Sequence, residues 1–289
     1  MLDMICKSIG NLFGKGKGSV ESYRKKAEEG DPEAQCNLGQ CYASGHGVPE
    51  NMEEAIEWYR KSAEQGYAPA QFYYGNYCYT IDDHTAAFQW WSKSAEQGYL
   101  DAQFIQGLAW YNGFGTERHR PNAFKWLRKA ADQGHGYSLF YLGLVQFQDY
   151  KNYEVAFDLW CDALRHYNSA ALGYLGLCFA CGYGTEKNMS AAVDFWKFGV
   201  EDGNAMSQYF LGHCYANGDG VPEDHKKAVE LWRLAAEQSD PEAQFCLGKS
   251  YEHGNGVTKD TVEAVKWYRK AAEKGNENAI KALQTLEAE

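Results

Sequence analysis

The chain has 289 residues, of which 45% are hydrophobic and 23% are charged. That much apolar side chain can offset the entropy lost on ordering, which excludes a wholly disordered protein. No run of about 18 uncharged apolar residues occurs, so the sequence predicts no membrane-spanning helix. The 28 basic and 39 acidic residues give a net charge of −11, which disfavours binding to the phosphate backbone of nucleic acids.

Residues 1–18 form the first predicted element. Their apolar residues recur mainly at spacings of three and four, as on one face of an amphipathic helix: Leu2, Ile5, Ile9, Leu12 and Phe13. Asp3 and Lys7 interrupt this stretch, which makes it a poor secretory signal. We therefore predict a helix that caps the rest of the chain, with a weak membrane-surface or partner-binding helix as the alternative.

The nine cysteines are odd in number and show no repeated pairing. With no secretory signal, free thiols in a reducing compartment are the simplest interpretation. The sequence therefore predicts a cytoplasmic protein.

A recurring phrase divides residues 19–289 into units of similar length. It reads Ala-Glu-Gln-Gly at 63–66 and 95–98 and returns elsewhere with small changes. The equivalent end positions are Gly30, Gly66, Gly98, Gly134, Tyr167, Gly203, Ser239 and Gly275. Successive steps are 36, 32, 36, 33, 36, 36 and 36 residues, which predicts seven repeats flanked by half-units at 19–30 and 276–289.

Each repeat reads as two helices. In the first repeat, Asp31 followed by Pro32 is a helix start, and Gly45 is a helix end. Asn51 then opens a second helix, which ends at Gly66. Small residues recur beside large aromatic ones, as expected where two helices cross closely.

One such helix pair cannot bury its apolar face alone, whereas stacked pairs bury it continuously. The predicted fold is therefore all-α: a right-handed α/α superhelical solenoid of about seven helix-pair repeats of 32–36 residues, with partial terminal caps. The second repeat, around Thr80–Thr85, is four residues short, and the fourth, around Gln148–Tyr153, is three short. We expect the local curvature to change at these two places.

Few motifs suggest chemistry. The Gly-x-Gly loops lack the third glycine and the preceding strand of a dinucleotide site, so we interpret them as helix-ending turns. Cys178 and Cys181 are expected to be core thiols, with half of a metal or redox site as the alternative. We expect most of the eight histidines, His135 among them, in loops or on exposed faces. No catalytic arrangement has a signature here, so the sequence predicts no enzyme, metal or cofactor.

The first helix of each repeat predicts a binding surface. At 100° per residue, Cys36, Gln40 and Ala43 lie opposite the face that packs inside the first repeat. The equivalent positions become apolar and aromatic in the middle of the chain. The predicted concave groove is lined by Phe72, Asn76, Tyr79, Phe104, Leu108, Tyr111, Phe140, Leu144, Phe147 and Leu177. The alternative is that these side chains pack between adjacent repeats.

The repeat pattern resembles the Sel-one-like repeat (SLR) family, which is related to the tetratricopeptide repeats. The pattern is Ala-x-x-x-Leu-Gly-x-x-Tyr-x-x-Gly-x-Gly-Val followed by Ala-x-x-Trp-Tyr-x-x-x-Ala-x-x-Gly, and it is fullest in Ala34–Gly66 and Ala243–Gly275. The resemblance implies an α/α solenoid that binds other proteins without catalysis.

The family's bacterial members imply three roles: an adaptor, a host-acting factor or an immunity protein that sequesters a toxin. We therefore expect a protein or peptide partner rather than nucleic acid or a membrane. A membrane-associated adaptor using residues 1–18 is one alternative. A β-lactam-binding enzyme is another, but the family members linked to that activity carry one cysteine pair per repeat, which is absent here.

Overall fold

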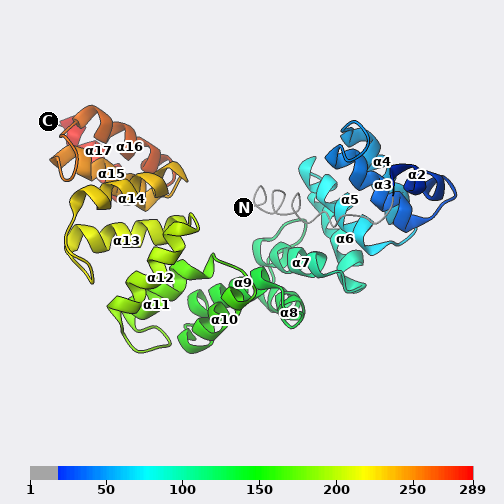
Figure 1. Cartoon of the computed structure of the whole chain (residues 1–289), viewed down its shortest axis with the longest axis horizontal. Coiled ribbons are helices and arrows are strands. Elements are labelled where there is room, and N and C mark those ends of the chain that lie inside the picture. The colour runs from blue at the N-terminus through cyan, green and yellow to red at the C-terminus, as the bar shows by residue number, and fades with distance from the viewer. Residues whose placement is uncertain (1–18, 289) are drawn as a thin grey trace. The chain divides into compact units, whose positions relative to one another are not determined.

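The computed structural model describes residues 19–288, which form helices joined by short loops (Figure 1). Within this range there are sixteen helices and no strands. In chain order they are α2 (Val20–Glu28), α3 (Pro32–Ser44), α4 (Met52–Glu64), α5 (Ala68–Thr80), α6 (His84–Glu96), α7 (Leu100–Asn112), α8 (Arg120–Ala131), α9 (Gly136–Gln148), α10 (Tyr153–Arg165), α11 (Ala171–Cys181), α12 (Met189–Glu201), α13 (Ala205–Asn217), α14 (His225–Glu237), α15 (Pro241–His253), α16 (Thr261–Glu273) and α17 (Glu277–Ala288). The predicted helical segment within residues 1–18 lies outside the described residues.

The helices form two compact units. Unit 1 contains α2–α8 up to residue 135, and unit 2 contains α9–α17 from residue 136. Within each unit, the two helices of a repeat pack together, and the second helix packs on the first helix of the next repeat. The seven predicted pairs run from α3 with α4 to α15 with α16, and α2 and α17 are the half-units. The expected all-α solenoid is confirmed.

Helix ends lie where the sequence predicts them. The Asp31 side chain accepts a hydrogen bond from the Ala34 amide, and the Asn51 side chain accepts one from the Glu54 amide. Each thereby satisfies a backbone donor that the first turn of a helix leaves unpaired. Gly45 ends α3 in the left-handed conformation, with φ of 67°, which glycine adopts without strain. Residues close in sequence thus determine where both helices of the first repeat begin and where the first helix ends.

A glycine in each first helix faces a large side chain of the second helix. A β-carbon at this glycine would lie within 2.9 Å of that side chain in all seven repeats. The pairs are Gly39–Tyr59, Gly75–Trp91, Gly107–Leu127, Gly143–Trp160, Gly176–Trp196, Gly212–Trp232 and Gly248–Tyr268. In three repeats the tryptophan also donates its indole N–H to a first-helix carbonyl at 3.2 Å. We call this pairing the glycine contact. It brings the large side chain against the backbone of the first helix.

The Gly-x-Gly loops also have a packing role. A side chain at Gly115 would run into the carbonyl of His84, where α6 begins, and one at Gly256 would run into the carbonyl of His225, where α14 begins. The second glycine of these loops therefore lets one repeat approach the helix start of the preceding repeat. This supports their interpretation as turns.

Buried glutamines connect the repeats. Gln35 donates its amide to the carbonyl of Ala27 in the preceding half-unit, at 3.1 Å, and accepts from the Gln65 amide at 2.7 Å. The same Gln–Gln bond joins Gln97 to Gln71, Gln133 to Gln103 and Gln238 to Gln208. Leucines replace the first glutamine in the fourth and fifth repeats, at Leu139 and Leu172. We call these paired glutamines the glutamine ladder.

The last repeat breaks the glutamine ladder. Lys274 stands where four other repeats carry the second glutamine, and it donates instead to the Ser239 carbonyl at 2.8 Å. The buried side-chain oxygen of Gln244 has no hydrogen-bond partner as a result. By contrast, Gln238 reaches both Gln208 and the Gly203 carbonyl.

Lys274→Gln should therefore stabilise unit 2. The new amide can donate to both Gln244 and Ser239, and satisfying one buried acceptor is worth about 1 kcal/mol. Thermal or urea unfolding measures the change. Lys281→Gln, on the exposed side of α17, removes the same charge and should leave stability unchanged. Equal effects of the two substitutions would contradict the proposed pairing.

Gly212→Ala should destabilise the chain although alanine favours helices. The new methyl group would lie 2.6 Å from the indole nitrogen of Trp232, and forcing them apart costs about 1–3 kcal/mol, more than the roughly 1 kcal/mol gained in helix propensity. Gly173→Ala, in α11, is the matched control, because a β-carbon there would approach its nearest neighbours, the side chains of Asn204 and Met206, only to 3.0 Å. Unfolding experiments should show a larger loss for Gly212→Ala, and a gain in stability there would contradict the glycine contact.

Candidate functional site

The ten predicted groove residues divide between the units, six in unit 1 and four in unit 2. Phe72, Phe104 and Leu108 are buried. The Phe72 ring lies against Tyr73 and Tyr99, and the Phe104 ring lies 4.8 Å from the imidazole of His135. These three side chains therefore offer no open surface here, and packing, the alternative interpretation, describes them better. The angular positions were calculated for one helix alone, so the prediction could not include neighbours such as Tyr99 and His135.

Tyr79 and Phe147 belong to two equivalent aromatic clusters. The Tyr79 ring lies 4.7 Å from His84 and 5.7 Å from Phe114 of the next repeat. The Phe147 ring lies 5.0 Å from Tyr153 and 5.4 Å from Tyr183 of the next repeat. Both clusters occur in the shortened repeats, where the inter-helix loop lacks its usual glycines. Each ring therefore packs mainly within its own repeat and adds one contact to the next repeat.

Asn76 and Tyr111 remain partly exposed in unit 1. The Asn76 side-chain oxygen accepts a hydrogen bond from the Trp91 indole at 2.9 Å, which fixes its orientation. The Tyr111 ring lies 4.7 Å from the Arg120 guanidinium, a cation–π distance. Tyr111 therefore presents one edge of a ring already held by a neighbour.

The first helices of unit 2 form a continuous row. The Phe140 ring of α9 meets the Tyr174 ring of α11 at 5.6 Å, α11 packs on α13, and the Cys246 thiol of α15 lies 3.5 Å from His213 of α13. Equivalent positions on the four helices carry Leu144, Leu177, His213 and Lys249. We call these four residues the first-helix row. Its first three members are half-buried and Lys249 is exposed.

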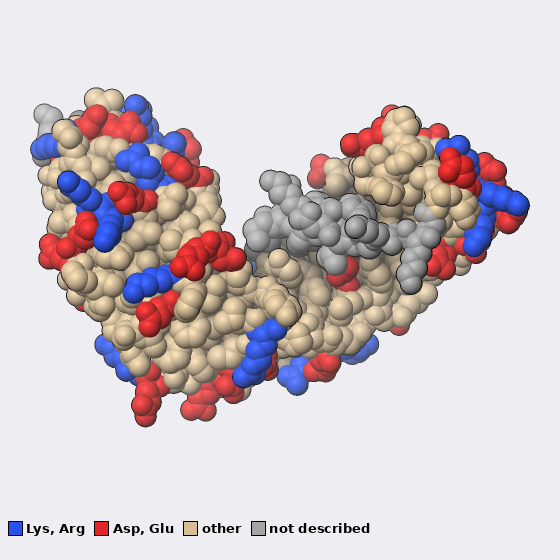
Figure 2. All heavy atoms as spheres, in the orientation of Figure 1, with Lys and Arg blue, Asp and Glu red and all other residues tan. Residues whose placement is uncertain are grey.

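The first-helix row changes character along its length. Leu144 and Leu177 give an apolar half, whereas His213 and Lys249 give a polar, basic half. The predicted groove included the two leucines but omitted His213 and Lys249. The 36-residue spacing from Leu177 identifies His213, and the same spacing from His213 identifies Lys249. Figure 2 shows acidic and basic side chains interspersed over the visible surface of unit 2, with uncharged surface between them.

The His213–Cys246 pair is not an activated nucleophile. Burial raises the pKa of the Cys246 thiol to about 12, with a further contribution from the Glu242 carboxylate. Burial also lowers the pKa of His213, and the nearby Lys249 ammonium acts in the same direction. Both groups are therefore neutral at pH 7, whereas a catalytic cysteine needs a thiolate.

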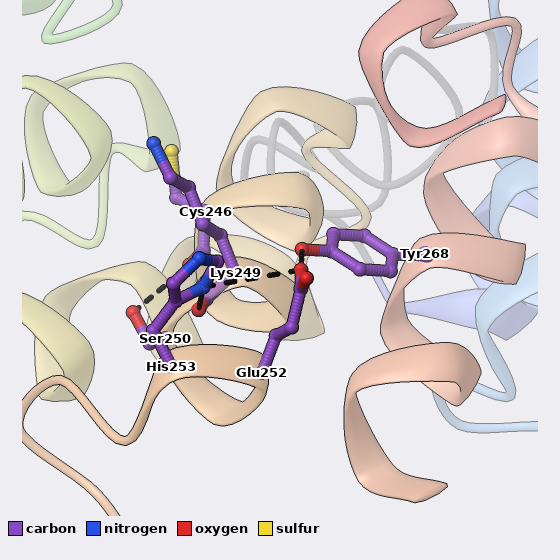
Figure 3. A network of polar contacts seen from close by, with 6 residues as sticks. All are labelled: Cys246, Lys249, Ser250, Glu252, His253 and Tyr268. Carbon is purple, nitrogen blue, oxygen red and sulfur yellow. Dashed lines mark hydrogen bonds and ion pairs between the residues drawn. The ribbon is translucent and has the colours of Figure 1, made fainter. Parts of the chain in front are cut away.

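The nearby carboxylate is directed elsewhere. Figure 3 shows Glu252 turned toward Tyr268 of α16, on the other side of α15 from the Cys246 sulfur. The Tyr268 hydroxyl donates a hydrogen bond to this carboxylate. Glu252 is therefore engaged by Tyr268 rather than by the His213 ring.

The other candidate chemistry of the sequence is not assembled. Cys178 is a buried free thiol, as predicted, with its pKa raised to about 12 by burial. The core prediction is wrong for Cys181, which is an exposed free thiol near the end of α11. Among the described side chains, no three His, Cys, Asp or Glu residues converge as a metal site. No helix between residues 19 and 288 is long and apolar enough to cross a membrane.

His135 lies in the loop between α8 and α9, as the sequence predicted, but it is not exposed. Its side chain is only 13% exposed, and its ring nitrogen lies 3.8 Å from the Asp101 carboxylate. Burial lowers the pKa of His135 to about 4 and raises the pKa of Asp101. The folded chain thus keeps this imidazole neutral.

Acidification should therefore destabilise unit 1. The unfolded chain takes up a proton at His135 near pH 6.5, whereas the folded chain resists until about pH 4. The stability contributed by the neutral ring is fully present above pH 6.5 and is lost toward pH 4, on the order of 3 kcal/mol. Urea unfolding of wild type and His135→Gln across this range should show a flatter profile for the variant. Parallel profiles would contradict the assignment.

A model of the Sel1 repeat family matches residues 32–67, 68–99, 102–135, 169–204, 205–240 and 241–276. Residues 136–168 are not matched, yet α9 and α10 form a helix pair there as in the other repeats. This is one of the two repeats that the sequence marks as shortened, and the family model matches the other, at 68–99. Comparison with curated proteins gave no match.

Solved structures of similar fold come from several organisms. A protective antigen of uropathogenic Escherichia coli with an SLR fold is 30% identical, with a TM-score of 0.72 over 91% of this chain and 58% of that chain. This chain therefore spans less than two thirds of that protein. A Sel1 repeat protein from Oxalobacter formigenes is 29% identical, with a TM-score of 0.69 over 92% of this chain and 80% of that chain. Yeast Tom70 shares the fold at 13% identity, with a TM-score of 0.51 over 93% of this chain and 57% of that chain.

Proposed function

The chain belongs to the Sel1 repeat family, whose solenoids are generally protein-interaction scaffolds, and we propose that it acts as an adaptor that binds a peptide or protein on the first-helix row of unit 2. The observation that carries the proposal is the partial exposure of Leu144 and Leu177 beside His213 and Lys249. Apolar anchors with a polar margin are typical of protein interfaces.

The packing of the first-helix row supports a preformed surface. Trp160 and Trp196 hold the helices through ring contacts with Tyr174 and Phe210, at 4.7 and 5.2 Å. A rigid surface loses little entropy on binding. The two leucines would receive apolar side chains of the partner. The partner surface that extends beyond the row would be neutral or basic, because the chain's net charge is −11.

The adaptor role agrees with the neutral state of the His213–Cys246 pair, in which the thiol is not an activated nucleophile. We also propose a reducing compartment, the cytoplasm, because the described cysteines carry free thiols.

A peptide selection tests the first-helix row. We expect a phage-displayed library of random peptides to yield sequences that bind wild type and lose about tenfold or more in affinity, roughly 1.4 kcal/mol, on Leu144→Lys with Leu177→Lys. Each leucine is replaced because a charge in an apolar contact is costly to desolvate. Fluorescence anisotropy measures the affinities.

Val262→Lys is the control, since this apolar residue of α16 is 69% exposed and lies outside the first-helix row. Selected peptides that bind the double variant as tightly as wild type would place the binding surface elsewhere. A loss of several kcal/mol in stability of the double variant would show that the leucines are core residues.

A further inference from the structure

The second helices carry a separate surface feature, on the side away from the glycine contact. Four of the seven repeats have a tryptophan followed three residues later by a lysine: Trp58 and Lys61, Trp90 and Lys93, Trp126 and Lys129, Trp267 and Lys270. The lysine ammonium lies 4.0–4.3 Å from the centre of the indole ring in each. These repeats therefore cover the apolar ring with a hydrated charge.

In α12 and α14, both positions are apolar. Phe195 and Phe198 replace the pair in α12, and Leu231 and Leu234 replace it in α14. The inner members are held by packing: Phe195 stacks on Phe179 at 5.3 Å, and Leu231 packs on the core cluster around Trp196. The outer members remain open to solvent, with Phe198 60% and Leu234 46% exposed.

Phe198 and Leu234 lie on the second helices of successive repeats in unit 2, α12 and α14. Leu231 of α14 packs against a cluster to which both α12 and α13 contribute. The exposed residues occupy the same register, 36 positions apart. Both helices pack on α13, so we treat the two side chains as paired anchors of successive repeats rather than as isolated apolar residues. We call Phe198 and Leu234 the outer pair.

The surroundings of the outer pair are acidic. Four exposed carboxylates stand within one helical turn of its members: Glu201, Asp202, Glu230 and Glu237. No ion pair engages any of the four within residues 19–288. The two nearby cations are already committed, since Lys197 pairs with Asp194 at 3.7 Å and Arg233 donates to the Tyr251 hydroxyl at 2.8 Å. The local field therefore attracts positive charge.

We propose that the outer pair is a second docking site, for an amphipathic helix of a partner protein that carries lysine or arginine beside its apolar face. Residues seven apart on a helix project from the same face, so one amphipathic helix can present an apolar side chain to each anchor. The basic residues meet the four unpaired carboxylates. The lysine-bearing repeats lack this site, because their ammonium groups cover the ring and repel a basic ligand.

This surface is distinct from the first-helix row, because its residues belong to the second helices and lie opposite the glycine contact. An adaptor with both surfaces holds two partners at once. The outer-pair proposal stands independently of the groove, since none of its residues contributes to the first-helix row.

A synthetic peptide of leucine and lysine, about 18 residues long so that it forms a helix, is the probe. Its leucines recur at i, i+3, i+4 and i+7. Fluorescence anisotropy should show saturable micromolar binding to the full chain. Phe198→Lys with Leu234→Lys introduces the lysine that four other repeats carry at this position and should weaken binding about tenfold or more. Val262→Lys adds a lysine elsewhere and should leave the affinity unchanged.

Three outcomes would overturn the proposal. The first is equal binding by the outer-pair variant, or by a peptide of the same composition with its leucines scattered, which would reduce the effect to general charge attraction. The second is loss of the probe on Leu144→Lys with Leu177→Lys, which would place it on the first-helix row. The third is a concentration-dependent dimer in sedimentation that the outer-pair variant abolishes, which would assign the surface to a second copy of the chain.

Discussion

The glycine contact determines how each helix pair closes. Because Gly212 has no side chain, the Trp232 ring reaches the backbone of α13 and donates its indole N–H to the Tyr209 carbonyl. The Trp232 ring is thus fixed by its close packing against Gly212 and by its hydrogen bond to the Tyr209 carbonyl. Its position sets the contact that the next repeat must fit, since Phe210 stacks on Trp196 and Tyr174 on Trp160. Closure within one repeat is thereby coupled to stacking between repeats.

Much of this architecture could be predicted because it is local. Asp31, Asn51 and Gly45 identify the ends of two helices within a few residues of sequence, and the 36-residue spacing carries the same information to every repeat. The divergent fourth repeat was also found this way, although the family model does not match it. Periodicity averages over copies, so one irregular copy does not hide the pattern.

The candidate site was less predictable, because exposure depends on neighbours that the period of one helix does not include. Phe72 has the angular position of a groove residue, yet Tyr73 and Tyr99 lie against it. Tyr79 and Phe147 are drawn into contacts by loop residues of the next repeat. Leu144 and Leu177 were also assigned to the groove by their angular position on the helix, and these two side chains are partly exposed. The outer pair was missed because the prediction considered only first helices, although the replacement of lysine by Phe198 and Leu234 is visible in the sequence.

The glutamine ladder has a consequence for how such a chain can change over generations. Both glutamines of a pair belong to the same repeat, as Gln208 and Gln238 do, while the carbonyl they reach is backbone and is present in every repeat. Duplication of a whole repeat by unequal crossing-over therefore copies each donor together with its acceptor. A breakpoint inside a repeat separates them and leaves a buried amide unpaired, as residue 274 illustrates on a small scale. We therefore expect selection to favour duplications and deletions in the gene that add or remove whole repeats.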